Sequence, residues 1–303
     1  MSASCSALAD LDRTNWAFCP STPPAIVFTV VFALTTFAHL SQAIFYKKAY
    51  CWVIVGSAFI QTVNYICRII SITNPNTLVI ITPPKKPNSN CTQIAPLFTN
   101  AFVYMVMGRM IWNYIPSAKL YRITAWRFSA FFVIFDIIAL IIQVAGASSS
   151  AGNRRPNQQV INAIHIYMGG VGFQQFFILL FLVFAMKFHR TIRQQVQQGV
   201  KGASGALPLL YAIYLVLALI TMRIVFRLCE YAQGFHSNIP THEAYQYCLD
   251  SVPMLFSLVI LNVIHPGRIM PGEESNIPSR KERKAQGIYS KSENISGSPV
   301  LTV

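Results

Sequence analysis

Charged side chains are scarce in this sequence. Asp, Glu, Lys and Arg make up 11% of the 303 residues, whereas hydrophobic types make up 53%. A soluble domain usually carries about a quarter charged residues, so composition excludes an ordinary soluble fold. Acidic residues are the scarcest group, with 10 Asp and Glu against 24 Lys and Arg, which gives a net charge of +14.

Recognisable catalytic and metal-binding patterns are missing as well. The sequence has no CxxC, HxxxH or HExxH spacing, and the GGVG run at Gly169–Gly172 follows no strand that would make it a nucleotide loop. We therefore expect no cofactor, no metal and no enzymatic activity. The positive charge is spread over short loops and a tail. It predicts contact with anionic inner-leaflet lipids rather than with nucleic acid.

Long apolar runs fill most of the chain. Runs near 20 residues have the length of a membrane-spanning helix, so we predict an all-α, multi-pass bundle of seven transmembrane helices. Residues 1–23 would form an N-terminal segment, 24–267 the bundle and 268–303 a disordered polar tail. The predicted spans are Pro24–Tyr46, Cys51–Ile72, Ile94–Ile115, Ala125–Gly146, Asn162–Lys187, Leu207–Glu230 and His242–Ile264.

Basic residues outside the spans predict the orientation. Most of them follow the first, third and fifth spans or lie in the tail, so the N-terminus is expected outside and the C-terminus in the cytoplasm. We expect a multi-pass protein of the plasma membrane. Cys19 and Cys91 would then lie on the oxidising side and could form a disulfide, although spacing alone does not fix the pairing. Asn90 begins an Asn-Cys-Thr sequon on the same side, a possible glycosylation site.

Ionisable and amide side chains inside the predicted spans are the strongest functional signal. Such groups are costly at bilayer depth and usually face the bundle interior. Arg223, Arg227 and Glu230 have i, i+4, i+7 spacing and form one stripe on the sixth span. Glu230 can reach Arg227, and Arg223 needs a carboxylate from Asp250 or Asp136. The other groups are Arg68, Arg109, Gln143, Gln174 and Gln175 within spans, and His265 at the end of the seventh.

Two interpretations of these groups remain open. The polar residues could form a packing network that only fixes helix positions, because interhelical polar pairs hold membrane helices together. Alternatively, they could line a hydrated cavity, open toward the outer leaflet, that holds the polar head of an amphiphile. From the rise of a helix, we expect Arg109 nearer the inner half of the bilayer, Asp136 near the middle and His265 at the inner end. The residues expected in the outer half are Arg68, Gln143, Arg223, Arg227, Glu230 and Asp250.

The order of these polar patches resembles the fungal RTA-like family of lipid-translocating exporters. The resemblance rests on RIVFRLCEYAQG, HEAYQYCLDSVPM and NVIHPGRIM near the C-terminus, and upstream on APLFTNAFVYMVMGRMI, FDIIALIIQVAGA and GGVGFQQ. It covers roughly residues 26 to 271. One departure is that Gln61 and Asn64 stand where the family usually has a glutamate and a glycine.

The resemblance implies a seven-helix translocator of sphingoid bases or toxic amphiphiles. Its pattern maps onto Arg68, Arg109, Asp136, Gln143, Gln175, Arg223, Arg227, Glu230, Glu243, Asp250 and His265. On this reading Asp250 and Glu230 receive a cationic head group or exchange protons, and the arginines pair them or bind an anionic head. A seven-helix lipid sensor without transport is the main alternative, and a membrane hydrolase is a third. No ATP-binding motif occurs, so uphill transport would need an ion gradient.

Overall fold

The fold is a bundle of long helices. The computed structural model describes residues 21–73, 89–121, 123–150, 157–232, 243–272 and 275–285, and the side chains of Cys19, Asn90 and Cys91 lie outside the described part. Within it, seven helices are long and apolar enough to cross a membrane, which confirms the predicted fold class. They are α2 (Thr22–Tyr46), α3 (Cys51–Thr73), α4 (Ser89–Tyr114), α5 (Ala125–Ser150), α6 (Asn157–Gln197), α7 (Ala206–Ala232) and a last span made of α9 (Glu243–Gln246), η2 (Tyr247–Ser251) and α10 (Val252–Val263).

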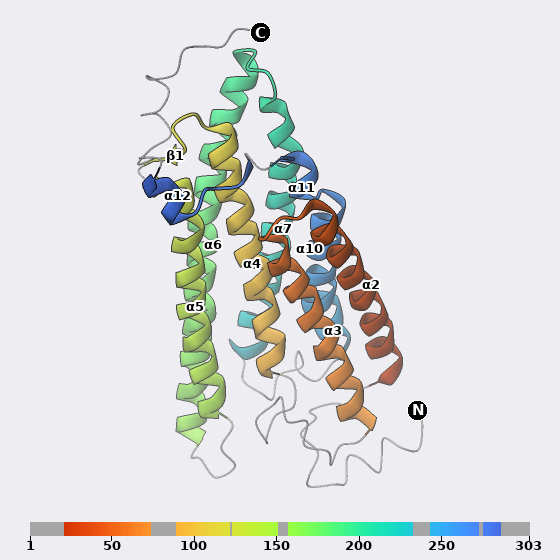
Figure 1. Ribbon diagram of the computed structural model, residues 1–303. Helices are drawn as coiled ribbons and strands as arrows, with labels where there is room; N and C mark the ends of the chain where they lie inside the picture. Colours follow the sequence, from red (N-terminus) through yellow and green to blue (C-terminus); the bar gives the residue numbers. More distant parts are fainter. Residues whose placement is uncertain are drawn as a thin grey trace.

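Successive helices run in opposite directions and pack side by side (Figure 1). Each contacts the next along the chain, and α10 contacts both α7 and α2, so the ring of helices is closed. We call the two ends of the bundle the Thr22 end and the Tyr46 end, after the first and last residues of α2. The Tyr46 end also carries the hairpin of β1 (Lys119–Leu120) and β2 (Ile123–Thr124), the short turn η1 (Ala203–Gly205) and α11 (Pro266–Ile269).

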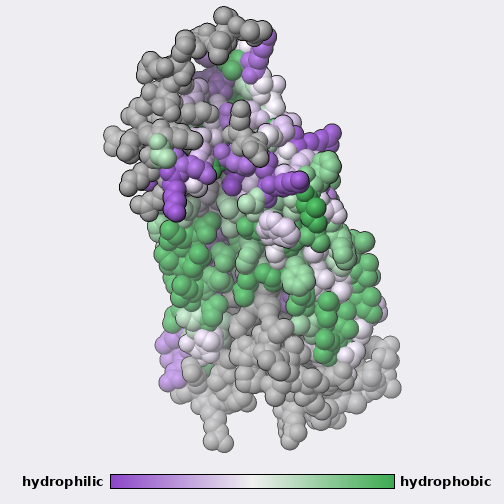
Figure 2. All heavy atoms as spheres, in the orientation of Figure 1, coloured by the Kyte–Doolittle hydropathy of each residue, from purple (hydrophilic) through white to green (hydrophobic). Residues whose placement is uncertain are grey.

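The outside of the bundle is apolar over a broad band. Phe37, Ile141, Phe176, Leu215 and Val263 all expose more than half of their surface. Figure 2 shows this band as continuous hydrophobic colour, with hydrophilic side chains gathered toward the Tyr46 end. A soluble protein seldom exposes so large an apolar surface, whereas the hydrocarbon core of a bilayer matches it.

The closest helix pair is α5 and α6, and glycine makes this packing possible. A Cβ atom at Gly170 would lie 2.9 Å from Gln143 Cγ and 3.1 Å from the carbonyl oxygen of Ala139. A Cβ atom at Gly146 would lie 2.5 Å from the backbone nitrogen of Tyr167. Small residues let membrane helices approach in this way.

Two predicted boundaries need correction. α6 continues well beyond the predicted span, to Asn157 at one end and Gln197 at the other, because hydropathy detects only the apolar stretch of a helix that goes on into polar sequence. The tail is also ordered farther than predicted. Its α12 (Arg280–Ala285) is helical, and Lys48 Nζ donates hydrogen bonds to Ser275 Oγ at 2.7 Å and to the carbonyl of Gly272. Buried polar contacts of this kind offset the entropy of ordering.

Candidate functional site

Arg223, Arg227, Glu230 and Asp250 form one ion-pair network near the Thr22 end. Arg227 Nη2 lies 2.7 Å from Asp250 Oδ2, and Arg227 Nη1 lies 3.1 Å from Glu230 Oε2. Arg223 Nε donates to Asp250 Oδ1. Asp250 is only 3% exposed, and both of its oxygens are engaged by guanidinium groups. Of the two partners predicted for Arg223, the structure selects Asp250.

A widened helical turn places Asp250 toward α7. Residues Tyr247–Ser251 form a π-helical turn, and Pro253 follows in the first turn of α10. Proline has no N–H to donate, so it cannot complete the regular hydrogen-bond pattern of the preceding turn. Such π turns change the direction of the side chains within them and are frequent at functional sites.

Arg68 and Glu243 form a second ion pair beside the first. Arg68 Nη2 lies 3.1 Å from Glu243 Oε1, and Arg68 Nη1 donates to Gln246 Oε1 at 3.0 Å. Ser21 donates to the other oxygen of Glu243 through its backbone nitrogen and its hydroxyl, at 2.9 and 2.7 Å. This pair therefore links α3, α9 and the start of α2.

A small cavity of about 10 Å³ lies between the two ion-pair groups. Gln61, Asn64 and Arg68 line it from α3, and Asp250 lines it from η2. The amides thus occupy the positions at which the resemblance led us to expect a glutamate and a glycine. In the described part of this region, three arginines (Arg68, Arg223, Arg227) pair with three carboxylates (Glu230, Glu243, Asp250), so their charges balance.

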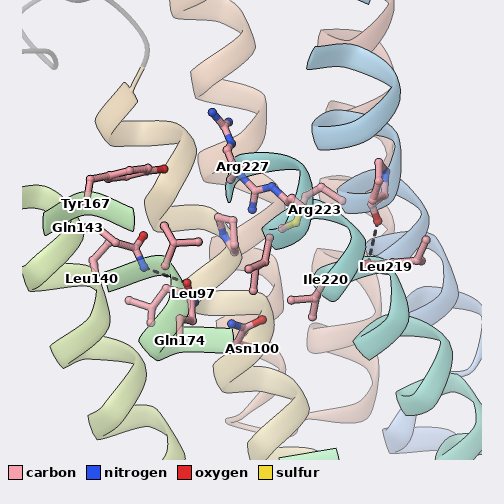
Figure 3. Close-up of a pocket in the computed structure, with 16 residues that line it drawn as sticks. Leu97, Asn100, Leu140, Gln143, Tyr167, Gln174, Leu219, Ile220, Arg223 and Arg227 are labelled. Carbon is pink, nitrogen blue, oxygen red and sulfur yellow. Dashed lines mark hydrogen bonds between the residues drawn. The ribbon is translucent and has the colours of Figure 1, made fainter. Parts of the chain in front are cut away.

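The larger cavity, of about 40 Å³, lies inside the bundle between α4, α5, α6, α7 and α10 (Figure 3). Its lining contains both polar and apolar side chains. The polar residues are Asn100, Gln143, Tyr167, Gln174, Arg223, Arg227 and Ser257. The apolar residues are Pro96, Leu97, Leu140, Val171, Leu219, Ile220, Ile224, Pro253 and Met254.

The two adjacent glutamines of α6 have different surroundings. Gln174 lines the larger cavity and accepts a hydrogen bond from Gln143 Nε2 at 3.0 Å (Figure 3). Gln175 instead donates to Thr221 Oγ1 at 3.4 Å and does not line the cavity. The structure therefore places Gln174 at the cavity, whereas the family resemblance singled out Gln175.

Asp136 contacts the cavity residue Asn100, and among the described residues it forms no ion pair. Its side chain is 1% exposed. Asn100 Nδ2 and the Tyr104 hydroxyl donate to its Oδ2 at 3.0 and 3.2 Å. Its Oδ1 has no hydrogen-bond partner among the described residues. Asn100 connects the two places, because it lines the cavity and binds the carboxyl.

Arg109 and His265 are not part of this assembly and lie at the Tyr46 end. The Arg109 guanidinium carbon lies 4.1 Å from the centre of the Tyr50 ring, and Arg109 Nη1 donates to the carbonyl of Met105. Burial raises the pKa of the Tyr50 phenol, so the ring remains neutral beside the cation. His265 stacks on Tyr46 and accepts a hydrogen bond from the backbone of Gly267, so it caps α11.

The pattern of charged and amide groups in the sequence pointed to Gln174 of this site. It did not reveal three further residues of the site or its surroundings, Asn100, Tyr104 and Tyr167. Their signal is weaker because an uncharged amide or phenol costs less in a membrane than an ion. Asn100 is nevertheless an amide within an apolar run, and this pattern alone marks it as a candidate for the interior of the bundle. Within the described residues, no group of three His, Cys, Asp or Glu side chains is arranged to hold a metal ion.

Comparison with known proteins identifies the family. The family model described as RTA1 like protein matches residues 53–273, which include every element of the cavity and the ion-pair groups. The chain belongs to this family. This match confirms the family resemblance that the sequence motifs indicated.

Several relatives of this RTA1-like chain carry transport names. "Probable lipid transporter atnI" of Emericella nidulans is 38% identical over 85% of this chain and 69% of that protein. "Protoporphyrin uptake protein 1" of Saccharomyces cerevisiae is 27% identical over 67% of this chain and 64% of that protein. "Sphingoid long-chain base transporter RSB1" of the same organism is 23% identical over 63% and 58%. The chain thus spans less than two thirds of the latter two. No solved structure matches.

Proposed function

We propose that this protein transports amphiphilic lipids or toxic amphiphiles across the membrane and is not an enzyme. One observation carries the proposal: the 40 Å³ cavity inside the spans is lined by amide, phenol and guanidinium groups together with aliphatic side chains. A polar head can hydrogen-bond to the polar groups while a hydrocarbon chain contacts the aliphatic ones.

The names of the relatives support the substrate class. One is named for lipid, one for sphingoid long-chain bases and one for protoporphyrin. These compounds share a large apolar part and a small number of polar groups. A cavity lined by both polar and aliphatic side chains suits that shared chemistry better than it suits an ion or a sugar.

The balanced charges refine how a head group would bind. Asp250 is held by Arg223 and Arg227, so it contributes more to keeping two arginines inside the bundle than to receiving a ligand. Asn100, Gln143 and Gln174 offer neutral donors and acceptors instead. We infer that a head group with hydroxyl, amine or amide functions is bound mainly through these amides.

Transport requires the helices to move. A cavity of about 40 Å³ has room for a few water-sized groups and not for a lipid chain. The structure thus corresponds to a closed conformation of the proposed cycle. Opening between α7 and its neighbours would admit a chain from the bilayer, as in the alternating arrangements of other transporters.

We further propose that the Thr22 end faces outward and the Tyr46 end faces the cytoplasm of a plasma-membrane protein. The Tyr46 end carries the basic residues Lys47, Lys119, Lys187, Arg190 and Arg193. Such an excess marks the cytoplasmic side and attracts anionic lipids of the inner leaflet.

The test is flux in liposomes that contain the purified protein and a fluorescent sphingoid base. Leu219→Trp fills the cavity from a half-buried position, so the larger ring need not disrupt the packing of the core. We expect it to slow flux by about tenfold or more, which corresponds to about 1.4 kcal/mol in the barrier. Leu215→Trp is the matched control, because Leu215 lies one turn away on α7 and is 52% exposed on the outside of the bundle.

The outcomes separate the hypotheses. Normal flux in Leu219→Trp would show that the cavity is not the route. A wild-type protein that binds the sphingoid base but moves none of several amphiphiles would indicate a lipid sensor and overturn the proposal.

A further inference from the structure

The buried carboxyl of Asp136 is the acidic group of the bundle that most needs an explanation. Its side chain is 1% exposed in the middle of α5, a helix long and apolar enough to cross a membrane. An isolated carboxylate is costly there, whereas a carboxylic acid, or a carboxylate beside a cation, is not. A carboxyl in such a place is normally paired or functional.

The partners of Asp136 are all uncharged. From α4, Asn100 and Tyr104 donate to Oδ2 at 3.0 and 3.2 Å. From α6, Gln174 lies beside the carboxyl. In the described part of the chain, no ion pair joins Asp136 to an arginine, lysine or histidine, and Oδ1 has no hydrogen-bond partner.

Asp250 provides the contrast within the same bundle. It has a similar exposed fraction, 3%, but two guanidinium groups occupy its oxygens. A proton or a cationic ligand at Asp250 would first have to break an ion pair with a buried arginine. At Asp136 the donors to be displaced, the Asn100 amide and the Tyr104 hydroxyl, are both uncharged.

Asn100 connects Asp136 to the cavity. Its side chain lines the cavity, and its Nδ2 binds the carboxyl. A rotation of this one amide would expose the carboxyl to a ligand in the cavity, next to Gln143 and Gln174. Asn100 is therefore a positioning residue.

We propose that Asp136 is the proton-binding residue of this transporter, and that it exchanges its proton for the cationic head of an amphiphilic ammonium ligand. The inference rests on the proposed function and names its coupling ion. When the ammonium reaches the cavity, the O–H bond of the carboxylic acid breaks and the proton leaves to water. The carboxylate then pairs with the ammonium, and it takes up a proton again when the ligand departs. One positive charge replaces another, so the exchange is electrically neutral.

The experiment uses the full-length protein in liposomes with a fluorescent long-chain quaternary ammonium compound. This probe cannot lose a proton, so it does not follow a pH gradient by itself. The probe is added outside liposomes whose lumen is one pH unit more acidic than the medium. If one proton is exchanged for one probe molecule, the probe should become about tenfold more concentrated in the lumen, because one pH unit corresponds to about 1.4 kcal/mol. A pH-sensitive dye in the lumen should report the matching loss of protons.

Asp136→Asn keeps the size of the side chain but replaces the carboxyl group by an amide that cannot release or take up the exchanged proton. We expect it to lose both the gradient-driven accumulation and the proton flux, while an uncharged long-chain diol is still transported. Asp136→Glu should restore part of the response. Glu282→Gln is the control acid, because Glu282 lies in α12 outside the spans, and it should behave as wild type.

The results distinguish the two proposals. If wild-type protein moves neither probe, the proposed transport function fails. If it moves both but ignores the pH gradient, or if Asp136→Asn keeps the response, only the role of Asp136 fails. Should Asp136→Asn not fold, Asn100→Leu removes one donor to the carboxyl and should shift the pH of half-maximal transport by about one unit. An unchanged pH profile in that variant would overturn the inference.

Discussion

Arg227 and Asp250 are 23 residues apart in the chain, yet Arg227 Nη2 and Asp250 Oδ2 are 2.7 Å apart. Their contact joins the last two spans at a depth where water is scarce. Arg223 shares the same carboxylate, so one acidic side chain holds two cations of α7 in place. These ion pairs add to the packing of α10 against α7 in fixing how the two spans lie.

Asp250→Asn should therefore destabilise the protein strongly. Buried Arg223 would lose its ion pair with Asp250 and Arg227 would keep only Glu230, and breaking a buried pair in this way typically costs about 3–5 kcal/mol. Thermal unfolding in detergent measures the loss. The double variant Arg223→Met with Asp250→Asn should be more stable than the two separate effects predict, by about 1–3 kcal/mol. Strict additivity would mean that the two residues do not interact.

Gly170 and Gly172 offer a matched pair on α6. A Cβ atom at Gly170 would meet the backbone of α5 at Gln143 and Ala139, whereas a Cβ atom at Gly172 has nothing within 4 Å. Gly172→Ala should stabilise the helix by up to about 1 kcal/mol through its higher helix propensity. Gly170→Ala should destabilise the bundle by about 1–3 kcal/mol through overpacking. Equal melting temperatures would contradict the close approach of α5 and α6.

Lys48 forms hydrogen bonds that hold the described part of the tail against the bundle. Its ammonium donates to Ser275 and Gly272, and hydrogen bonds to charged groups contribute about 1.5–3 kcal/mol each. Lys48→Met should expose the peptide bonds after Lys281 and Arg283 to trypsin and speed cleavage about tenfold. Lys47→Met is the control, because Lys47 is exposed at the end of α2. Unchanged cleavage would show that the tail is held by other contacts.

Tyr50 supports Arg109 at the Tyr46 end through the face of its ring. Tyr50→Leu should cost about 1–2 kcal/mol, because the cation loses the aromatic face, whereas Tyr50→Phe keeps it and should change stability much less. Chemical denaturation of both variants makes the comparison. If Phe and Leu have the same effect, the ring does not stabilise the arginine.

The length of the apolar runs was sufficient to predict the seven spans, but it did not predict where every helix begins and ends. α3 was predicted to end at Ile72 and ends at Thr73, whereas α6 runs ten residues past Lys187, because polar sequence can continue a helix that has left the apolar layer. Helix periodicity was likewise sufficient for contacts within one helix. The pair Arg227–Glu230 follows directly from i, i+3 spacing.

Contacts between helices were harder to predict. Periodicity gives the face on which Arg223 lies but not which neighbour meets it, so its partner remained a choice between Asp250 and Asp136. The π turn at Tyr247–Ser251 changes the direction of Asp250 in a way that a regular helix would not show. Asn100 and Tyr104 gained their importance only when the structure placed them beside Asp136.

The pairing of three arginines with three carboxylates in the described Thr22 half has an electrical consequence. One elementary charge that crosses a membrane gains or loses about 2.3 kcal/mol for every 100 mV. α3, which carries Arg68, can shift together with α7 and the α9–η2–α10 span, and this balanced group then carries almost no net charge through the field. The resting voltage of the cell then neither drives nor opposes that movement, and the conformational cycle can proceed equally well in polarised and depolarised membranes.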